Sequence, residues 1–342
     1  MPDPILVEAT RGGAIESEHR GALAVMDGDG RAVLTLGDAE RAVFPRSAVK
    51  ALQALPLIET GAADRYGLTQ AELALACSSH SGEPRHAEAA ASMLAKAGRD
   101  VACLECGTHW PSNEQAARQL AAAGREPTAL HNNCSGKHSG FICVACATDT
   151  DPKGYIRPDH PVQRRIKGIL EEMMGVALPD AARGTDGCSI PTYASPLTGL
   201  ATAFARFGSG AGLSNERAMA AGRLRQAVAS DPFMVAGSRR FDTVVMQALG
   251  EKVFTKTGAE GVYCAALPQQ GLGIALKCDD GAGRAAEAVM AALILAYVPL
   301  SGEEQQLVAS HADKPIANWN GIETGRLRVT QELKARAKPL AT

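Results

Sequence analysis

The sequence predicts an α+β protein in which strands from both ends of the chain form one antiparallel sheet, flanked by helices. Near the N-terminus, short apolar runs at residues 5–10, 21–26 and 33–36 are separated by turn-forming residues. Near the C-terminus, three closely spaced apolar runs within 252–277 are joined by glycine-containing turns. Between about 65 and 250 the patterning is mostly helical. We therefore expect the terminal strands (5–36 and 252–277) to share one sheet in a single domain, 1–342.

Local signals predict the individual elements. The Asp-Gly-Asp-Gly of 27–30 predicts a hairpin turn, because glycine tolerates the positive φ of such turns. Residues 45–58 predict a helix, and Thr69 with Glu72 three residues later forms a capping pattern at the start of another. The segment 131–140 is too rich in Asn, Ser, Gly and His for a core element. Further helices are expected at 86–98, 113–124, 141–146, 158–175, 196–207, 214–230, 242–249 and 284–298.

Composition limits the partners that the protein can have. The 342 residues are 46% hydrophobic with a formal net charge of −2, and no basic patch is present, which argues against nucleic acid. The longest apolar stretch, 285–298, contains Glu287 and is too short to span a bilayer. The first residues lack a signal-peptide pattern, and nine scattered cysteines point to a reducing compartment. We expect a cytoplasmic protein that binds neither nucleic acid nor membranes.

A serine and a lysine stand three residues apart at the start of the helix predicted over 45–58. On a helix, Ser47 and Lys50 lie on one face about a turn apart, so their polar ends can form a hydrogen bond. This arrangement lets an amine take the serine proton, as in serine acylases that have no histidine base. Alone the pattern is weak, because Ser-x-x-Lys also occurs by chance in helices whose lysine is simply solvated.

Two further stretches agree with the same outline. The Lys-Thr-Gly of 256–258 closes the first strand of the C-terminal meander, where a strand edge can line a cleft and hydrogen-bond an extended substrate. The Ser-His-Ser of 79–81 is a partial match to the Ser-x-Asn loop of the penicillin-recognising serine enzymes. The order along the chain agrees with those enzymes, although the middle of this chain is far longer. Together the stretches favour a serine acyl hydrolase.

Five sequence blocks occur in a fixed order: 44–50 (FPRSAVK), 79–83 (SHSGE), 132–138 (NNCSGKH), 185–188 (TDGC) and 255–260 (TKTGAE). Together they resemble the rhizobial-type L-asparaginases, a family distinct from the threonine-dependent bacterial enzymes and the plant-type enzymes. The resemblance covers nearly the whole chain. It implies hydrolysis of L-asparagine to L-aspartate and ammonia, a fold like that of the serine β-lactamases and glutaminases, and a homodimer.

The resemblance implies two Ser-Lys tandems, which fall here on Ser47 with Lys50 and on Ser79 with Lys256. Chemically, Ser47 is the expected nucleophile, since the first turn of a helix offers unpaired N–H groups to a developing oxyanion. To act as base, Lys50 must be neutral near pH 7–8. Its pKa must therefore lie roughly three units below the usual lysine value of about 10.4, a shift that costs about 4 kcal/mol. Burial beside a second cation, Lys256, can supply that. Ser79 would then relay protons between Lys256 and the leaving ammonia, and which serine attacks first stays open.

The resemblance also implies a zinc ion held by Cys134, Lys137 and Cys188. A lysine ligand must be deprotonated, which zinc itself would drive. Three protein ligands leave a fourth position open for water. We expect zinc to position the substrate rather than to generate the nucleophile, because the two Ser-Lys pairs already account for acyl transfer.

Charge and position indicate the substrate contacts. Asp186, beside one of the expected zinc ligands, is expected to pair with the α-ammonium group of the substrate. Arg46 or His138 is expected to reach its α-carboxylate. Asparagine and glutamine differ by one methylene, worth only about 1–3 kcal/mol in a pocket, so side activity on glutamine stays open.

The sequence also leaves other interpretations than an asparaginase. A β-lactamase, a D-alanyl peptidase and a glutaminase are the enzyme alternatives, and the missing export signal argues against the first two. A non-catalytic zinc or amino-acid sensor would bind its ligand without turnover. Two Cys-x-x-Cys pairs, 103–106 and 143–146, are too far apart for a zinc knuckle, and the second lies in an apolar helix. The turn 109–111 is interpreted as loop packing rather than as a border of the cleft or a dimer contact.

Overall fold

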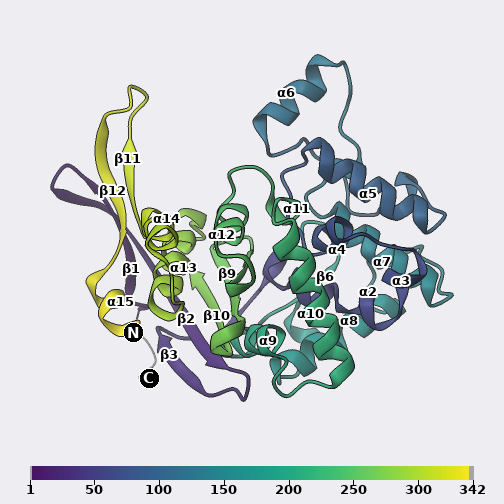
Figure 1. Cartoon of the computed structure of the whole chain (residues 1–342), viewed down its shortest axis with the longest axis horizontal. Coiled ribbons are helices and arrows are strands. Elements are labelled where there is room, and N and C mark those ends of the chain that lie inside the picture. The colour runs from purple at the N-terminus through teal and green to yellow at the C-terminus, as the bar shows by residue number, and fades with distance from the viewer. Residues whose placement is uncertain (1, 339–342) are drawn as a thin grey trace. The chain divides into compact units, whose positions relative to one another are not determined.

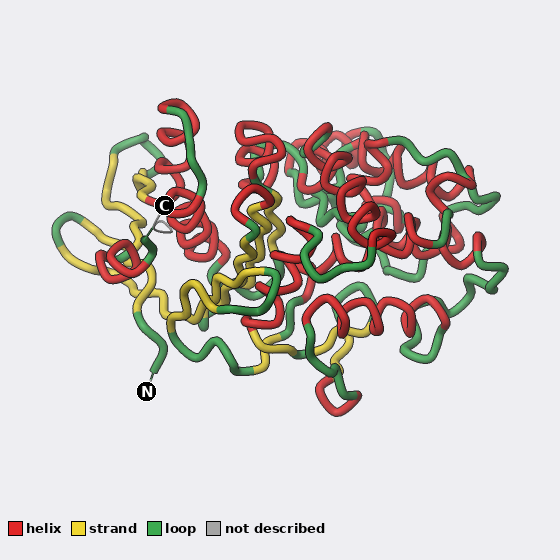
Figure 2. Tube along the Cα trace, turned by 60° about the horizontal axis from the view of Figure 1, so that its bottom comes forward, coloured by secondary structure: helices red, strands yellow, loops and turns green. Residues whose placement is uncertain are grey.

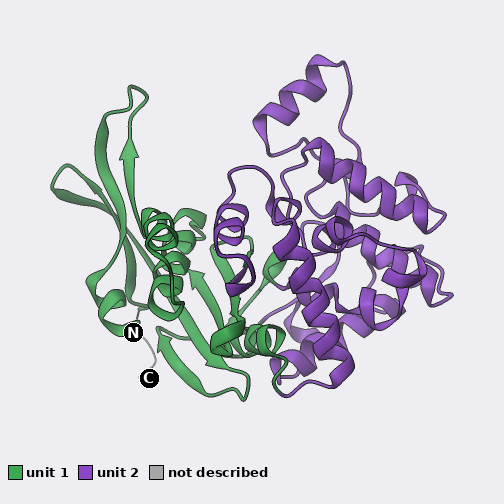
Figure 3. Cartoon of the chain, in the orientation of Figure 1, with its two compact units in different colours: residues 1–48, 195–211, 255–342 green, residues 49–194, 212–254 purple. Residues whose placement is uncertain are grey.

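Residues 2–338 are described by a computed structural model, so the outermost residues of the predicted 1–342 domain lie outside the described part. Contacts divide the chain into two units, coloured separately in Figure 3. The first unit consists of Met1–Ala48, Ser195–Ala211 and Thr255–Thr342, and the second of Val49–Ala194 and Gly212–Phe254. The first unit contains the main sheet, and the second is mostly helical. Figure 2 colours the helices and strands of the whole chain.

Strands from both ends of the chain form one sheet in the first unit, which confirms the predicted fold class. Within residues 2–338 this sheet has eight strands in the order β11-β12-β1-β2-β10-β9-β8, with β3 paired to β2. The pairings of β12 with β1 and β11, of β2 with β1, β3 and β10, and of β10 with β9 are antiparallel. The strands are β1 (Ile5–Arg11), β2 (Ala14–Asp27), β3 (Ala32–Leu36), β8 (Phe254–Thr257), β9 (Val262–Leu267), β10 (Leu272–Cys278), β11 (Asp313–Ala317) and β12 (Glu323–Val329).

The long strand β2 connects the N-terminal and C-terminal parts of the sheet. Its first half, 14–20, pairs with β1, and its second half pairs with β10 on one side and β3 on the other. Gly21 lies at the change of partner. A Cβ there would lie 2.2 Å from the carbonyl oxygen of Lys277, so glycine is what allows β10 to approach this closely.

Two helices cover the central strands. The helix α9 (Leu197–Ser209) packs against β2, β9 and β10, and α13 (Gly283–Tyr297) packs against β9, β10, β1 and β12. Because side chains alternate along a strand and nearly every residue of β9 and β10 is buried, both faces of these strands are covered. The helix α14 (Gly302–Ala312) packs on α13 (Figure 1). This core holds β8, which carries Lys256, at one end of the sheet.

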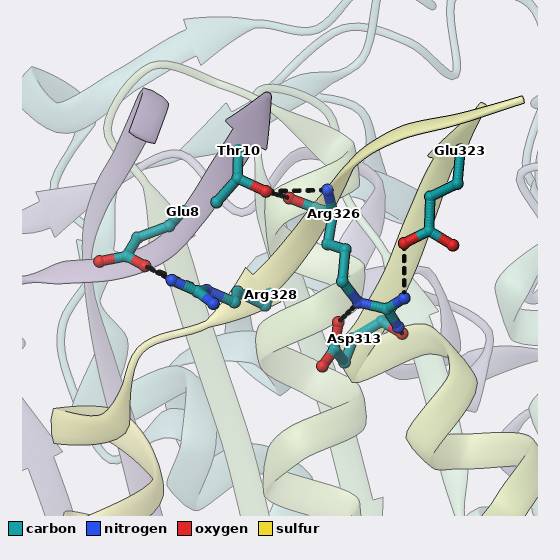
Figure 4. Close-up of polar contacts among 6 residues, drawn as sticks. All are labelled: Glu8, Thr10, Asp313, Glu323, Arg326 and Arg328. Atoms are coloured by element: carbon teal, nitrogen blue, oxygen red, sulfur yellow. Dashed lines mark hydrogen bonds and ion pairs between the residues drawn. The ribbon is translucent and has the colours of Figure 1, made fainter. Parts of the chain in front are cut away.

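The hairpin of β11 and β12 was not predicted from the sequence (Figure 1). Figure 4 shows its polar contacts: Arg328 pairs with Glu8 at 3.1 Å, and Arg326 pairs with Asp313 at 2.7 Å. The backbone N–H of Arg326 also donates to the Thr10 hydroxyl at 2.9 Å. Exposed ion pairs contribute only about 0–1 kcal/mol each. The hairpin therefore depends mainly on its backbone ladder and on the pairing of β12 with β1.

The second unit is built around α7 (Ser135–Ala147). This helix packs against α4 (Gln70–Ala76) and α5 (Pro84–Lys96), and its residues 135–145 are all buried. The close packing depends on Gly136, where a Cβ would lie 2.4 Å from both Cγ and the carbonyl oxygen of Leu75. The helix α4 begins with the capping box predicted from Thr69 and Glu72.

The prediction that 131–140 lies outside the core is wrong. Ser135 and Ser139 are fully buried at the start of α7. The Ser135 hydroxyl donates to the carbonyl of Leu130 at 2.9 Å and lies 2.9 Å from Nε2 of His80. The Ser139 hydroxyl donates to the carbonyl of Ala90 at 3.3 Å. Polar groups can be buried when they are hydrogen-bonded, and these partners come from other segments of the unit.

The single helix expected over 45–58 is also wrong. A 3₁₀ turn, Arg46–Val49, is followed by α1 (Lys50–Gln53) and α2 (Leu55–Glu59). Pro56 explains the break, because it has no N–H to continue the hydrogen-bond ladder of α1. The N–H of Ala48 is paired with the carbonyl of Pro45 at 3.0 Å, so it is not one of the free donors expected for an oxyanion.

Seven of the remaining predicted helices are present within three residues of their expected ends, whereas α7 begins six residues before the expected 141. They include α6 (Glu114–Ala122), α8 (Pro161–Met174), α10 (Asn215–Ser230) and α12 (Phe241–Leu249). Among residues 2–338, none of the helices combines the length and the apolar character that crossing a membrane requires. Short elements complete the chain: α3 (Ala62–Arg65), α11 (Phe233–Ala236), α15 (Gln331–Arg336), β4 (Ala42–Val43) with β7 (Ser195–Pro196), and β5 (Arg183–Thr185) with β6 (Pro191–Tyr193).

Candidate active site

Five of the predicted site residues form one cluster inside the second unit. Lys50 opens α1, Ser79 follows α4, Cys134 precedes α7, Lys137 lies in its first turn, and Cys188 lies between β5 and β6. Their exposed fractions are only 0–7%. Burying two lysines at this depth is costly unless anionic or hydrogen-bonding partners surround them. The contacts described next supply such partners.

Lys50 joins the serine to one of the cysteines. Its Nζ donates to Oγ of Ser79 at 2.9 Å and to Sγ of Cys134 at 3.0 Å. Ser79 is held in place by its backbone, whose N–H donates to the carbonyl of Val235 at 2.8 Å. The backbone N–H of Cys134 donates to Oδ1 of Asn132 at 2.9 Å. A lysine amine is thus fixed between a hydroxyl and a sulfur atom.

The two cysteines and Lys137 converge beside Lys50. The Cys188 thiol hydrogen-bonds Cys134, which lowers the pKa of Cys134 well below its usual value and raises that of Cys188. Nζ of Lys137 lies 3.0 Å from Sγ of Cys188. Burial opposes the charge of Lys137, but the sulfur atoms of Cys188 and Cys134 outweigh it and raise the lysine pKa. In this arrangement the Cys134 sulfur faces the amines of both Lys50 and Lys137.

A tight turn positions Cys188. The backbone N–H of Asp186 donates to the carbonyl of Ile190 at 2.9 Å, and that of Ser189 donates to the carbonyl of Asp186 at 2.8 Å. Ser189 has a φ of 74°, in the left-handed region that non-glycine residues rarely adopt. Oδ1 of Asp186 accepts from the N–H of Gly187 at 2.8 Å. The carboxylate of Asp186 is therefore held at the cluster, where its charge contributes to the raised pKa of Lys137.

His138 follows Lys137 and is completely buried. Burial, reinforced by the charges of Lys137 and Lys50, lowers its pKa well below the usual value, so the ring is neutral near pH 7. Its Nδ1 lies 2.6 Å from the hydroxyl of Tyr155, whose oxygen also accepts from the N–H of Glu105 at 2.8 Å. A substrate carboxylate near His138 would thus meet a neutral ring rather than the cation that the sequence suggests.

Arg46, Ser47 and Lys256 belong to the first unit. The end of β8 packs directly on the segment that leads to Ser47, since a Cβ at Gly258 would lie 2.8 Å from the carbonyl oxygen of Pro45. Lys256 is fully buried, and its Nζ donates to the carbonyl of Thr257 at 2.7 Å. The Lys-Thr-Gly strand and the serine turn, some 200 residues apart in sequence, thus meet in one unit.

Arg46 has a strained backbone and lines a hollow. Its φ is 50°, in the left-handed region. With Phe44, Lys277 and Glu260 it borders a cavity of about 380 Å³ in the first unit. Strained backbone conformations cluster at functional sites, and Arg46 directly precedes Ser47, the predicted nucleophile. The cavity shows that space for a small ligand exists beside Arg46.

The cluster in the second unit contains donors suited to zinc. Among residues 2–338, no group of three or more His, Cys, Asp or Glu side chains is arranged to hold a metal ion. A metal site here therefore depends on Lys137 as the third donor beside Cys134 and Cys188. Two sulfur atoms and one amine are ligand types that zinc accepts. The donor set fits zinc, provided that Lys137 and Cys188 lose their protons on binding.

The structure joins some of the predicted residues and adds others. Lys50 bonds Ser79, a contact between the two predicted tandems. The pairings of Ser47 with Lys50 and of Ser79 with Lys256 stay predictions. Sequence reasoning missed Asn132, although it lies in a quoted block, and Tyr155, which no motif marks. The turn at 109–111 lies near the cluster, because His109 Nε2 accepts from the N–H of Asn133 at 3.0 Å.

A buried lysine bonded to a serine hydroxyl is the geometry of a serine hydrolase that uses an amine in place of histidine. The profile of the L-asparaginase II family matches residues 7–329. The chain therefore belongs to the L-asparaginase II family, which indicates an L-asparaginase and confirms the resemblance seen in the sequence. A search of curated proteins gives no significant match.

Solved structures give weaker similarities. A β-lactamase from Mycobacterium bovis is 14% identical, with a TM-score of 0.41, covering 78% of this chain and 89% of its own. A mutant of simvastatin synthase from Aspergillus terreus is 11% identical, with a TM-score of 0.40, covering 76% and 86%. At these TM-scores the similarity carries no conclusion about this chain beyond the comparison itself.

Proposed function

We propose that the protein hydrolyses L-asparagine to L-aspartate and ammonia through a serine ester, with lysine as the base. The observation that carries the proposal is the buried 2.9 Å hydrogen bond between Lys50 Nζ and Ser79 Oγ, in a chain of the L-asparaginase II family. We further propose that it acts as a cytoplasmic homodimer. Both of these properties come from the sequence.

In the proposed acylation, Oγ of Ser47 attacks the side-chain amide carbon of asparagine. Neutral Lys50 accepts the serine proton, and the carbon–nitrogen bond then breaks. Oγ of Ser79 hydrogen-bonds the same lysine nitrogen, so it is placed to pass a proton to the leaving nitrogen, which departs as ammonia. The product of this step is an aspartyl ester on Ser47.

Deacylation reverses these roles. Water replaces ammonia, Lys50 accepts its proton, and attack on the ester carbon releases L-aspartate and restores the hydroxyl of Ser47. Lys256 is proposed as the second positive charge of the site, which disfavours a further ammonium group nearby. This role is supported by its complete burial at the end of the strand that packs on Pro45.

We propose Cys134, Lys137 and Cys188 as the ligands of a zinc ion. When bound, zinc would supply a fixed positive charge that orients a polar group of the substrate. The support from this chain is the convergence of the three donors, with the Lys137 amine 3.0 Å from the Cys188 sulfur, and the depressed pKa of Cys134, since zinc binds thiolate.

The substrate's charged groups have candidate partners. Asp186, nearly buried and held by its own turn, is proposed to bind the α-ammonium group. Arg46 is proposed to bind the α-carboxylate, for which it borders a cavity in the first unit. His138 is neutral, so its proposed contribution is a hydrogen bond to the carboxylate rather than a charge.

The test is ammonia release from L-asparagine and L-glutamine by the wild type and by Ser47→Ala and Ser79→Ala, with zinc measured on each protein. Ser78→Ala is the matched control, because Ser78 is equally buried and its Oγ has no hydrogen-bond partner among the described residues. We expect Ser78→Ala to be active, Ser47→Ala to be inactive and Ser79→Ala to be strongly impaired.

Each outcome has a clear meaning. No turnover of either amide by a zinc-loaded wild type would favour the non-catalytic sensor over the enzyme. Full activity of Ser47→Ala would remove Ser47 as nucleophile while leaving an asparaginase. Faster turnover of L-glutamine than of L-asparagine would change the proposed substrate to the longer amide.

A further inference from the structure

A second cavity lies in the second unit, apart from the residues assigned to catalysis and zinc. It has a volume of about 220 Å³ and is lined by α5, by α6 and by His131 of the 3₁₀ turn Ala129–His131. Its apolar wall includes Pro84, Pro111 and Leu120. Pockets for drug-sized ligands measure about 300–1,000 Å³. The cavity therefore suits a smaller molecule.

Two opposite charges line this cavity without pairing. Glu88 of α5 and Arg125, which follows α6, both border it. Among residues 2–338, neither side chain forms an ion pair or a hydrogen bond. By contrast, an arginine of α6, Arg118, forms an ion pair with Glu114 at 3.0 Å. A carboxylate and a guanidinium left unpaired around one cavity are complementary to a ligand that carries both charges.

His131 adds a neutral donor to the lining. Its Nδ1 accepts from the backbone N–H of Thr128 at 3.0 Å. A neutral imidazole that accepts at one nitrogen carries its hydrogen on the other, so Nε2 is the donor. Burial, together with nearby positive charge, lowers the pKa of His131, so the ring stays neutral at pH 7. The cavity thus combines a cation, an anion, an N–H donor and an apolar wall.

We propose that this cavity binds a free α-amino acid. The α-carboxylate would pair bidentately with Arg125 and accept from His131, the α-ammonium would pair with Glu88, and the side chain would lie against the apolar wall. A simple anion would leave Glu88 unused, and a simple amine would leave Arg125 unused. Gly82 also lines the cavity and lies three residues after Ser79, so an occupant would contact the segment that carries the proposed catalytic serine.

Tryptophan fluorescence can report binding at this cavity. The chain has two tryptophans: Trp110 directly precedes Pro111 of the lining, and Trp319 is fully exposed. In a Trp319→Phe protein the signal comes from Trp110 alone. The probe is L-aspartate, which the proposed reaction does not consume. We expect a saturable fluorescence change whose midpoint rises at least tenfold in Arg125→Gln and in Glu88→Gln.

Controls separate this proposal from its alternatives. Arg118→Gln removes the same charge from α6 outside the cavity and should leave the midpoint unchanged. Succinate, which lacks the ammonium group, should bind the Trp319→Phe protein at least tenfold more weakly than L-aspartate. The proposal is overturned if L-aspartate causes no saturable change, if both cavity variants keep the original midpoint, or if succinate binds equally well.

The proposed catalysis is tested independently by ammonia release. With L-asparagine and no added aspartate, Arg125→Gln and Glu88→Gln should work at the wild-type rate, because neither belongs to the catalytic cluster. Normal ammonia release without any fluorescence response would overturn the second site alone. A fluorescence response without ammonia release would overturn the proposed function alone.

Discussion

Replacing Lys50 tests its proposed role as the base that accepts the serine proton. Its side chain is fully buried and its Nζ bonds both Ser79 and Cys134. A positioned acid or base contributes about 10²–10⁴-fold to a rate, which corresponds to about 2.7–5.4 kcal/mol at 1.36 kcal/mol for each factor of ten. Methionine has a side chain of similar length to lysine but no amine. We therefore expect Lys50→Met to lower kcat/KM for L-asparagine by about 10²–10⁴-fold.

A second substitution separates proton transfer from simple charge. Arginine remains protonated in proteins, so Lys50→Arg keeps the positive charge but cannot accept a proton from serine. We expect it to be as inactive as Lys50→Met. The assay is the initial rate of ammonia release, with thermal unfolding to verify folding and the exposed Lys153→Met as control. A folded Lys50→Met within tenfold of wild type, or an active Lys50→Arg, would refute the role of Lys50 as base.

Three further predictions concern stability, each read from urea unfolding. Gly136→Ala should lower the free energy of unfolding by about 1–3 kcal/mol through overpacking. Its control is Gly168→Ala on α8, where a Cβ meets nothing within 4 Å, and this change should raise the free energy of unfolding by about 0.5–1 kcal/mol. Equal effects of the two substitutions would contradict the packing of α7. Burial opposes ionisation of Glu72, but its bond from Lys96 at 2.6 Å helps to lower the carboxyl pKa. That stabilisation is complete above the unfolded pKa of about 4.3 and is lost as pH falls through the lower folded value. Glu72→Gln should thus be destabilised at pH 7 and approach wild type below about pH 4; a pH-independent difference would argue against the pair. Tyr155→Phe should cost about 1–3 kcal/mol, because it leaves the part-buried N–H of Glu105 and the buried ring nitrogen of His138 without their hydroxyl partner. An unchanged unfolding midpoint would contradict this.

The strands could be predicted because each carries its own signal. The apolar runs at 21–26 and 272–277 are buried on both faces and are bounded by glycine or aspartate. Their pairing also followed, since strands at the two chain ends bracket a helical middle and have few other partners. Local sequence was therefore sufficient for the central part of the sheet.

Other elements depend on partners that are distant in sequence. The polar start of α7 is buried because His80 and Ala90, about 50 residues away in sequence, hydrogen-bond its serines, and nothing near 135–140 reveals this. The strand β11 is mostly exposed and lacks apolar alternation. In β12 the buried positions do alternate, but only Leu327 and Val329 among them carry a large apolar side chain, so the run is too short to predict a strand. The break before Pro56 was readable in principle, because proline ends the ladder of a preceding helix.

The candidate site could also be predicted only in part from the sequence. Motifs named Ser79, Lys50 and Cys134 individually, but their contacts come from three separate segments of the second unit. Sequence spacing favoured Ser47 as the partner of Lys50, whereas the structure adds a bond to Ser79. Tyr155 lies in no motif, and only the hydrogen bond to His138 at 2.6 Å identifies it.

The most direct test is to stop turnover of L-asparagine within milliseconds and to measure the mass of the intact chain and of its peptides. An aspartyl ester mapped to Ser47 is the predicted result. An ester mapped to Ser79 would transfer the attack to the hydroxyl that Lys50 bonds. If the chain carries no aspartyl group during steady turnover, and none accumulates in a slowed Ser79→Ala protein, serine attack is contradicted.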